Sequence, residues 1–129
     1  MSHTFSVSLV APSHPLLSFE AVSLRAPGIG GQFGIMANRA PLVAALRIGV
    51  VHIVDIVAGD SWFGITGGFL EMIDNKVTIL ADDLITPGMI PEPRESGKHK
   101  VLFKDSYDSD EEKLAFAQEL LIRALERDA

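Results

Sequence analysis

The sequence predicts a mainly β protein, in which a β-sandwich of about ten short strands is followed by a linker and one C-terminal α-helix. Three observations favour this class. Apolar and polar residues alternate with a period of two in the first 86 residues, turn-forming residues separate these runs, and charged residues concentrate in the last third. The expected units are a β-sandwich domain over 1–86, a proline- and glycine-rich linker over 87–108 and a helix over 109–128.

The strands follow from this alternation and from the residues that interrupt it. In residues 5–9, apolar side chains alternate with serines, so one face of the strand can be buried. Pro12 and Pro15 are expected to end this run, and Pro27-Gly28 is expected to close the next. We expect the other strands over residues 17–24, 32–36, 43–46, 50–57, 62–66, 69–73 and 77–81.

Two hairpin turns are predicted between the later strands. Residues 58–60 are expected to join the strands over 50–57 and 62–66. Asp74-Asn75 is expected to join the last two strands, because both residue types tolerate left-handed turn conformations.

The charged last third predicts a single helix. Ser109 and Glu112 have the spacing of a capping box, in which the two side chains satisfy backbone amides at the start of a helix. Leu114, Ala117 and Leu121 share one stripe of this helix. Because an isolated helix of this length is marginally stable, its apolar face needs a partner, either the sandwich or another chain.

Composition makes several classes of protein and site improbable. The 129 residues include no cysteine, so we expect neither a disulfide nor a thiolate metal site. The net charge is −6 and no basic cluster precedes residue 94, so we expect no nucleic-acid partner. No apolar run reaches the ~20 residues needed to cross a bilayer, so we expect no membrane insertion. The first residues do not show a basic region followed by an apolar core and a small-residue cleavage site, so we also expect no signal peptide.

The residue patterns do not indicate catalysis or cofactor binding. The glycines in residues 28–34 are interpreted as turn formers, because Phe33 stands where a dinucleotide-binding fingerprint needs a small residue. The histidines lack metal-ligand spacing, and we expect His52 to be a partly exposed packing residue. Asp82-Asp83 is interpreted as a cap or turn. We therefore expect no catalytic residue, no cofactor and no metal site.

Three segments together resemble a known family: GGQFGIMANRAPLVAAL (30–46), ITGGFLEM (65–72) and KVTILAD (76–82). Their order and spacing resemble the N-terminal domain of the epsilon subunit of rotary F-type ATP synthases, called delta in mitochondria. The resemblance covers residues 4–83. It implies a non-catalytic central-stalk subunit that joins the gamma subunit to the membrane rotor ring and couples ion translocation to ATP synthesis or hydrolysis. It also implies a peripheral location at the cytoplasmic face of a bacterial membrane.

The resemblance implies a rotor-ring contact at Gln32 and Arg39. These residues match the positions of a glutamate and a histidine in the family motif, so one negative charge is lost at Gln32 and a permanent positive charge stands at Arg39. In the C-terminal region, Leu120 stands where an ATP-binding motif of the family has an acid, so nucleotide binding is not expected. The shortened tail suggests a divergent or alternative ion-translocating form.

One alternative is a free-standing domain that binds a small ligand, or an enzyme of unknown type. The apolar first unit lacks a set of titratable residues that would converge on a substrate, which disfavours this alternative.

Overall fold

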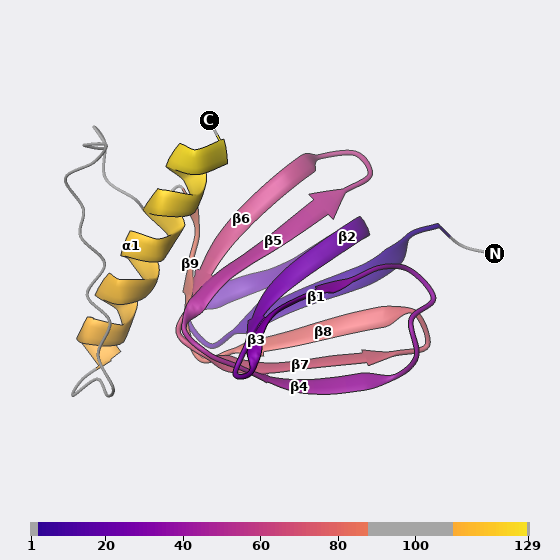
Figure 1. Ribbon diagram of the computed structural model, residues 1–129, viewed down its shortest axis with the longest axis horizontal. Helices are drawn as coiled ribbons and strands as arrows, with labels where there is room; N and C mark the ends of the chain where they lie inside the picture. Colours follow the sequence, from indigo (N-terminus) through magenta and orange to yellow (C-terminus); the bar gives the residue numbers. More distant parts are fainter. Residues whose placement is uncertain (1–2, 88–109, 129) are drawn as a thin grey trace.

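The computed structural model describes residues 3–87 and 110–128, in which nine strands form a β-sandwich and one helix lies against one end of it (Figure 1). The predicted fold class is thereby confirmed. The expected linker over 87–108, apart from residue 87, and the expected cap at Ser109 lie outside the described residues. The elements are β1 (Phe5–Ala11), β2 (His14–Gly28), β3 (Gly31–Ile35), β4 (Leu42–Leu46), β5 (Gly49–Asp55), β6 (Gly59–Ile65), β7 (Gly68–Ile73), β8 (Lys76–Ala81), β9 (Leu84–Ile85) and α1 (Asp110–Asp128).

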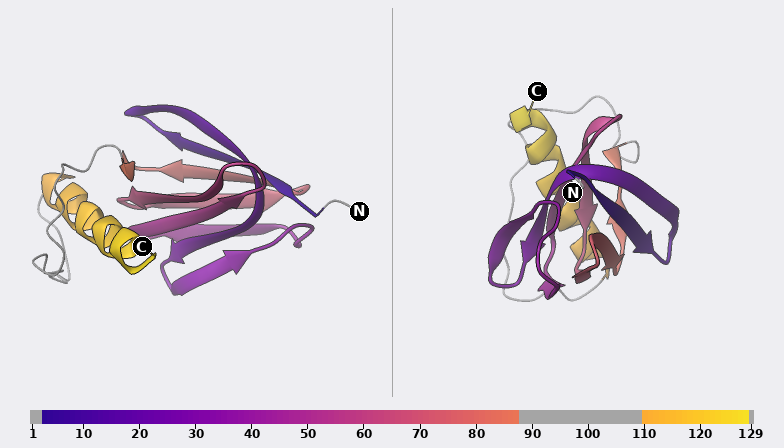
Figure 2. Two further views of the ribbon diagram at one scale, coloured as in Figure 1. Left: turned by 90° about the horizontal axis from the view of Figure 1, so that it is seen from above. Right: turned by 90° about the vertical axis from the view of Figure 1, so that its right-hand side faces the viewer.

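The two layers belong to one continuous hydrogen-bonded sheet that folds back on itself (Figure 2). Strands β1, β8, β7 and β4 form one layer, and β5, β6, β9 and the second half of β2 form the other, with β3 beside β2. The first half of β2 pairs with β1 and the second half with β5 and β3. A register shift between Ala21 and Ser23 marks the point where β2 passes from one layer to the other.

One expectation about the strands is wrong. Pro15 was expected to help end the first run, but it lies near the start of β2. The expected ends at Pro12 and at Pro27-Gly28 are confirmed, because β1 ends at Ala11 and β2 ends at Gly28. Pro15 is tolerated because it lies opposite the stretch of β1 between Leu9 and Ala11, where the β1–β2 register is irregular. The pairing there does not require the N–H that proline lacks. The short strand β9 was not expected, because two residues are too few to show alternation.

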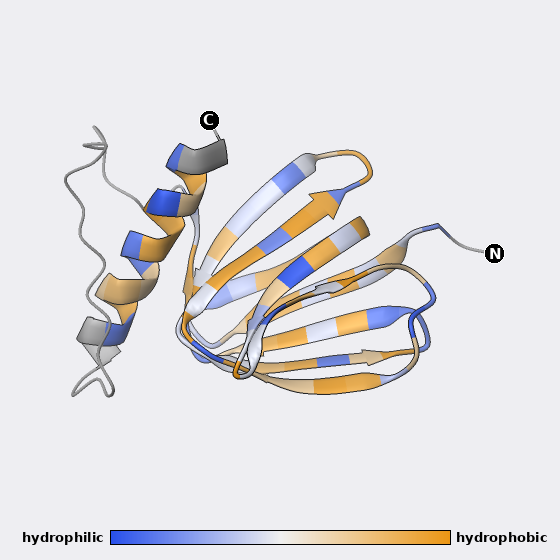
Figure 3. Cartoon of the chain, in the orientation of Figure 1, coloured by the Kyte–Doolittle hydropathy of each residue, from blue (hydrophilic) through white to orange (hydrophobic). Residues whose placement is uncertain are grey.

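The sandwich core consists of the inward-facing residues of both layers. Polar and apolar positions alternate along the strands accordingly (Figure 3). The largest buried side chains of this core are Phe5, Leu9, Leu24, Ile35, Ile53, Ile65, Leu70, Met72, Ile79 and Leu84. Every member of this cluster lies in the sandwich. The expected division into a domain over 1–86, a linker and a helix remains a prediction.

Helix α1 packs on the sandwich through a second apolar cluster. Ala117 and Leu121 are buried as expected, and Ile122 is buried beside them. On the sandwich side, Ile85 and Trp62 meet the helix. The sequence left open whether the apolar face of the helix packs on the sandwich or on another chain, and in the structure it packs on the sandwich.

Gly64 on β6 sets how closely the helix approaches. A Cβ atom at this position would lie 3.1 Å from the carbonyl oxygen of Ala117 and 3.5 Å from Cβ of Ile85. The helix backbone therefore rests directly on the strand backbone, and a larger residue would push the helix away.

We predict that Gly64→Val displaces α1 while the sandwich stays folded. The branched side chain suits a strand but collides with the Ala117 carbonyl. Trp62 is the only tryptophan in the sequence, so its emission should shift to longer wavelength as water replaces the helix. Gly30→Ala is the control, because a Cβ at Gly30 meets nothing within 4 Å. An unchanged emission spectrum in Gly64→Val would contradict this account.

Candidate interaction site

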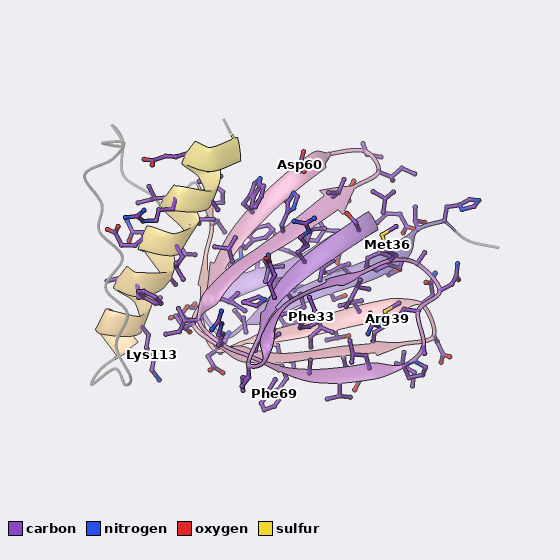
Figure 4. The ribbon with its side chains drawn as sticks, in the orientation of Figure 1. Phe33, Met36, Arg39, Asp60, Phe69 and Lys113 are labelled. Atoms are coloured by element: carbon purple, nitrogen blue, oxygen red, sulfur yellow. The ribbon has the colours of Figure 1, made fainter. Side chains whose placement is uncertain are left out.

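The structure places Gln32 on β3 and Arg39 in the following loop, with the Arg39 side chain in contact with β3. Gln32 is exposed on β3, opposite Pro27 of β2, which is the one described strand that pairs with β3. Arg39 is exposed in the loop between β3 and β4, and its Nη1 donates to the carbonyl oxygen of Gly34 at 3.3 Å. Its guanidinium group therefore lies along β3, two residues from Gln32. Figure 4 places Arg39 toward the end of the sandwich that lies away from helix α1.

The loop that carries Arg39 is held by the turn between β7 and β8. Asp74 and Asn75 have φ values of 50° and 60°, and they link the paired residues Ile73 and Lys76. The predicted two-residue turn is thus confirmed. Asn75 also reaches out of its turn, because its Oδ1 accepts from the backbone N–H of Asn38 at 2.7 Å.

A second turn at this end of the sandwich is organised by Asp55. Its carboxylate accepts from the backbone N–H groups of Val57 at 2.8 Å, Ala58 at 2.9 Å and Glu20 at 3.0 Å. These donors, that of Ala58 first, lower the pKa of Asp55 below its ordinary value because they stabilise the carboxylate. The motif fixes an apolar hairpin tip that includes Val57, which is 91% exposed. The sequence analysis did not identify Asp55, although an aspartate four residues before Gly59 is a turn signal.

Other polar groups have structural partners. Nε2 of His52 lies 2.6 Å from Oδ1 of Asp60, and the His52 ring stacks on Trp62 with centroids 3.8 Å apart. This environment agrees with the expected packing role of His52. Oδ1 of Asp83 accepts from Leu84 N at 2.9 Å and from the Ser13 hydroxyl at 2.6 Å, as a turn residue would. Among the described residues, no three His, Asp or Glu side chains gather in a way that could hold a metal.

The outer face of the layer β1–β8–β7–β4 carries a continuous row of apolar side chains, which we call the apolar row. Ala45 pairs with Phe69, Phe69 with Leu80 and Leu80 with Val10, so the four residues cross four strands side by side. Phe69 is 59% exposed and Leu80 is 53% exposed. In Figure 4, Phe69 points away from the sandwich. The cluster that joins α1 to the sandwich contains none of these residues.

These features define a class of protein, a β-sandwich with a docked helix and two exposed surfaces on its remaining faces. Residues 4–87 match the family model for the ATP synthase delta/epsilon chain β-sandwich domain. The chain belongs to this family, and the resemblance found in its sequence is confirmed. Within the described part of the chain, the helix is not long and apolar enough to cross a membrane.

Relatives with curated names agree with this family. The chain is 46% identical over 79 residues to the ATP synthase epsilon chain of Syntrophomonas wolfei, covering 61% of this chain and 58% of that one. It is 34% identical over 119 residues to the epsilon chain of a Janthinobacterium species, covering 92% and 84%. In the first of these two matches, this chain therefore spans about three-fifths of its relative's length.

Two solved assemblies contain chains of the same fold. One is the Euglena gracilis mitochondrial ATP synthase, OSCP/F1/c-ring, where the TM-score is 0.64 at 17% identity and the match covers 70% of this chain and 58% of that one. The other is the central stalk and c-ring of the Tetrahymena thermophila mitochondrial ATP synthase, with a TM-score of 0.56 at 22% identity over 92% and 94%. At these low sequence identities, the two matches show that the folds are alike and nothing further.

We predict that the Asp55 turn makes stability depend on pH in the acid range. The pKa of Asp55 is lowered on folding, so its contribution is present above its unfolded pKa of about 3.9 and is lost as pH falls through the lower folded pKa. The excess stability of wild type over Asp55→Ala, measured by urea unfolding, should therefore shrink below about pH 4. Asp55→Asn, which keeps an acceptor oxygen but carries no charge, should be less stable than wild type at neutral pH and approach wild type at low pH. A pH-independent difference between wild type and Asp55→Ala would contradict this role.

Proposed function

We propose that this chain is a non-catalytic central-stalk subunit of an F-type ATP synthase. In this role it joins the gamma subunit to the membrane rotor ring and keeps ion translocation coupled to ATP synthesis or hydrolysis. The family of the sandwich and the epsilon-chain names of its relatives support the proposal. The subunit would lie at the cytoplasmic face of a bacterial membrane and be held there by its partners.

The observation that carries this proposal is the apolar row. Exposed apolar groups that form a continuous patch mark protein interaction sites. Here the patch is widened by Val43, which is 73% exposed on the same face of β4. Its side chains stand on four hydrogen-bonded strands, so little conformational entropy is lost when a partner binds. We assign this face to the gamma subunit.

The second surface is the exposed edge of the sandwich that carries Gln32 and Arg39, which we assign to the rotor ring. An arginine presents several N–H donors in a rigid fork, which suits carboxylate or carbonyl groups on a partner. Its contact with the Gly34 carbonyl directs the guanidinium group along β3 and limits the positions it can occupy. The loss of the family glutamate at Gln32 leaves Arg39 without an acidic neighbour at that position, which favours an acidic or carbonyl-bearing partner.

The two surfaces explain how a subunit without chemistry of its own could serve rotation. The apolar row lies on β1, β8, β7 and β4, whereas Gln32 lies on β3 beside β2. Two partners could therefore bind at the same time, and torque between them would pass through the hydrogen-bonded sheet. The alternative of a free-standing ligand-binding domain predicts elution as a monomer with a bound small molecule.

We predict that the double variant Phe69→Ser/Leu80→Ser binds the gamma subunit more weakly. Each substitution removes apolar area that binding would bury, and together they should cost about 2 kcal/mol, or raise Kd about 30-fold. Isothermal titration of purified gamma subunit measures this change, and circular dichroism checks the fold.

The matched control is Val57→Ser, which removes a still more exposed apolar side chain outside the apolar row. Its Kd should stay within about twofold of wild type. If Val57→Ser weakens binding and the double variant does not, the gamma subunit binds elsewhere. If wild type binds no gamma subunit and purifies with a small ligand, the alternative function is supported instead.

A further inference from the structure

Asn75 connects three segments that are far apart in the sequence. Its Oδ1 accepts from the Asn38 N–H at 2.7 Å, and its Nδ2 donates to the carbonyl oxygen of Thr4 at 2.8 Å. Its own carbonyl oxygen accepts from the Ser6 N–H at 3.3 Å. One residue in the β7–β8 turn thus ties the loop before Arg39 to the start of β1.

We infer that Asn75 is the positioning residue for Arg39. Its side chain fixes the backbone of Asn38, the residue immediately before Arg39, and so limits the directions in which the Arg39 side chain can leave the loop. The functional meaning of this inference rests on the proposed contact between Arg39 and the rotor ring, whereas its structural content can be tested without the ring.

The loop needs such a support. Residues 38–41 are all exposed, so none of their own side chains is anchored in the core. Asn38 has a φ of 63°, a left-handed conformation that is uncommon for residues other than glycine and is tolerated best by asparagine and aspartate. A hydrogen bond to the Asn38 N–H favours this conformation over the alternatives that the exposed loop could adopt.

The chemistry of the site is specific for an asparagine. The side chain must accept from an N–H on one side and donate to a carbonyl on the other, and a primary amide does both. Aspartate could accept from Asn38, but its second oxygen would face the Thr4 carbonyl without a proton. The Thr4 contact is partly buried, which raises the cost of leaving that carbonyl unsatisfied.

Gln32 does not depend on this support. It lies within β3, where pairing with Pro27 and the rest of β2 sets its position. The inference therefore separates the two residues of the proposed ring contact. The Gln32 side is held by the sheet and the Arg39 side by a side chain from another hairpin. Loss of Asn75 should loosen only the second.

The test compares Asn75→Gly with Asp74→Gly. Both residues occupy the same two-residue turn with positive φ, so glycine fits either position and the effects on the turn itself are matched. The bridge to Asn38 is made by Asn75. Amide hydrogen exchange of the full chain, followed by NMR, should show about tenfold faster exchange at the Asn38 amide in Asn75→Gly. In Asp74→Gly the rate should stay within about twofold of wild type.

Asn75→Asp gives a further readout that general loosening of the turn would not produce. It keeps an acceptor for Asn38 and loses the donor to Thr4, so the Asn38 amide should be protected to a degree between wild type and Asn75→Gly. Equal acceleration in Asn75→Gly and Asp74→Gly, or no acceleration in either, would overturn the inference.

Binding to purified rotor ring separates this inference from the proposed function. Asn75→Gly should weaken binding in the wild-type chain and have no further effect in a chain that carries Arg39→Ala, because both changes remove the same contact. If Arg39→Ala leaves ring binding unchanged, the proposed ring contact fails while the exchange result at Asn38 stands. If Arg39→Ala weakens binding and Asn75→Gly does not, Asn75 does not position Arg39.

Discussion

Strand β2 is the element on which the rest of the structure depends. Its fifteen residues belong to both layers, and it pairs with β1, β3, β4 and β5. A strand shared in this way fixes the separation and the register of the layers, so that the inward residues of both meet in one core. It also positions β3, and with it the polypeptide that carries Gln32 and leads to Arg39.

The two layers of the sandwich differ in how much of their apolar outer surface is covered. Helix α1 covers part of β5, β6 and β9, where the backbone at Gly64 permits close contact. The apolar row on the opposite layer stays exposed within the described structure, although its side chains are as apolar as those beneath the helix. A chain that buries one apolar surface internally and leaves another exposed is suited to assembly with a partner, and this contrast is the physical basis of the proposed stalk role.

Much of the sandwich could be predicted because its strands and turns are indicated by residues that are close together in the sequence. Alternation revealed the buried faces, and Asp74-Asn75 revealed a turn. The start of β2 could not be predicted from Pro15, because a proline is tolerated in a strand only where the neighbouring strand does not need its N–H, and that depends on which residues lie opposite.

The candidate site was less predictable. Gln32 and Arg39 came from a resemblance to a family and not from the chemistry of their surroundings. The contact of Asn75 with Asn38 joins residues 37 positions apart and leaves no periodic signal.

Site-directed cross-linking in the assembled complex tests the central claim most directly, because the chain has no cysteine of its own. Arg39→Cys should cross-link to the rotor ring, Phe69→Cys to the gamma subunit, and Arg123→Cys on α1 should not reach the ring. Cross-linking of positions 39 and 69 to the same partner, or of position 123 to the ring, would contradict the account.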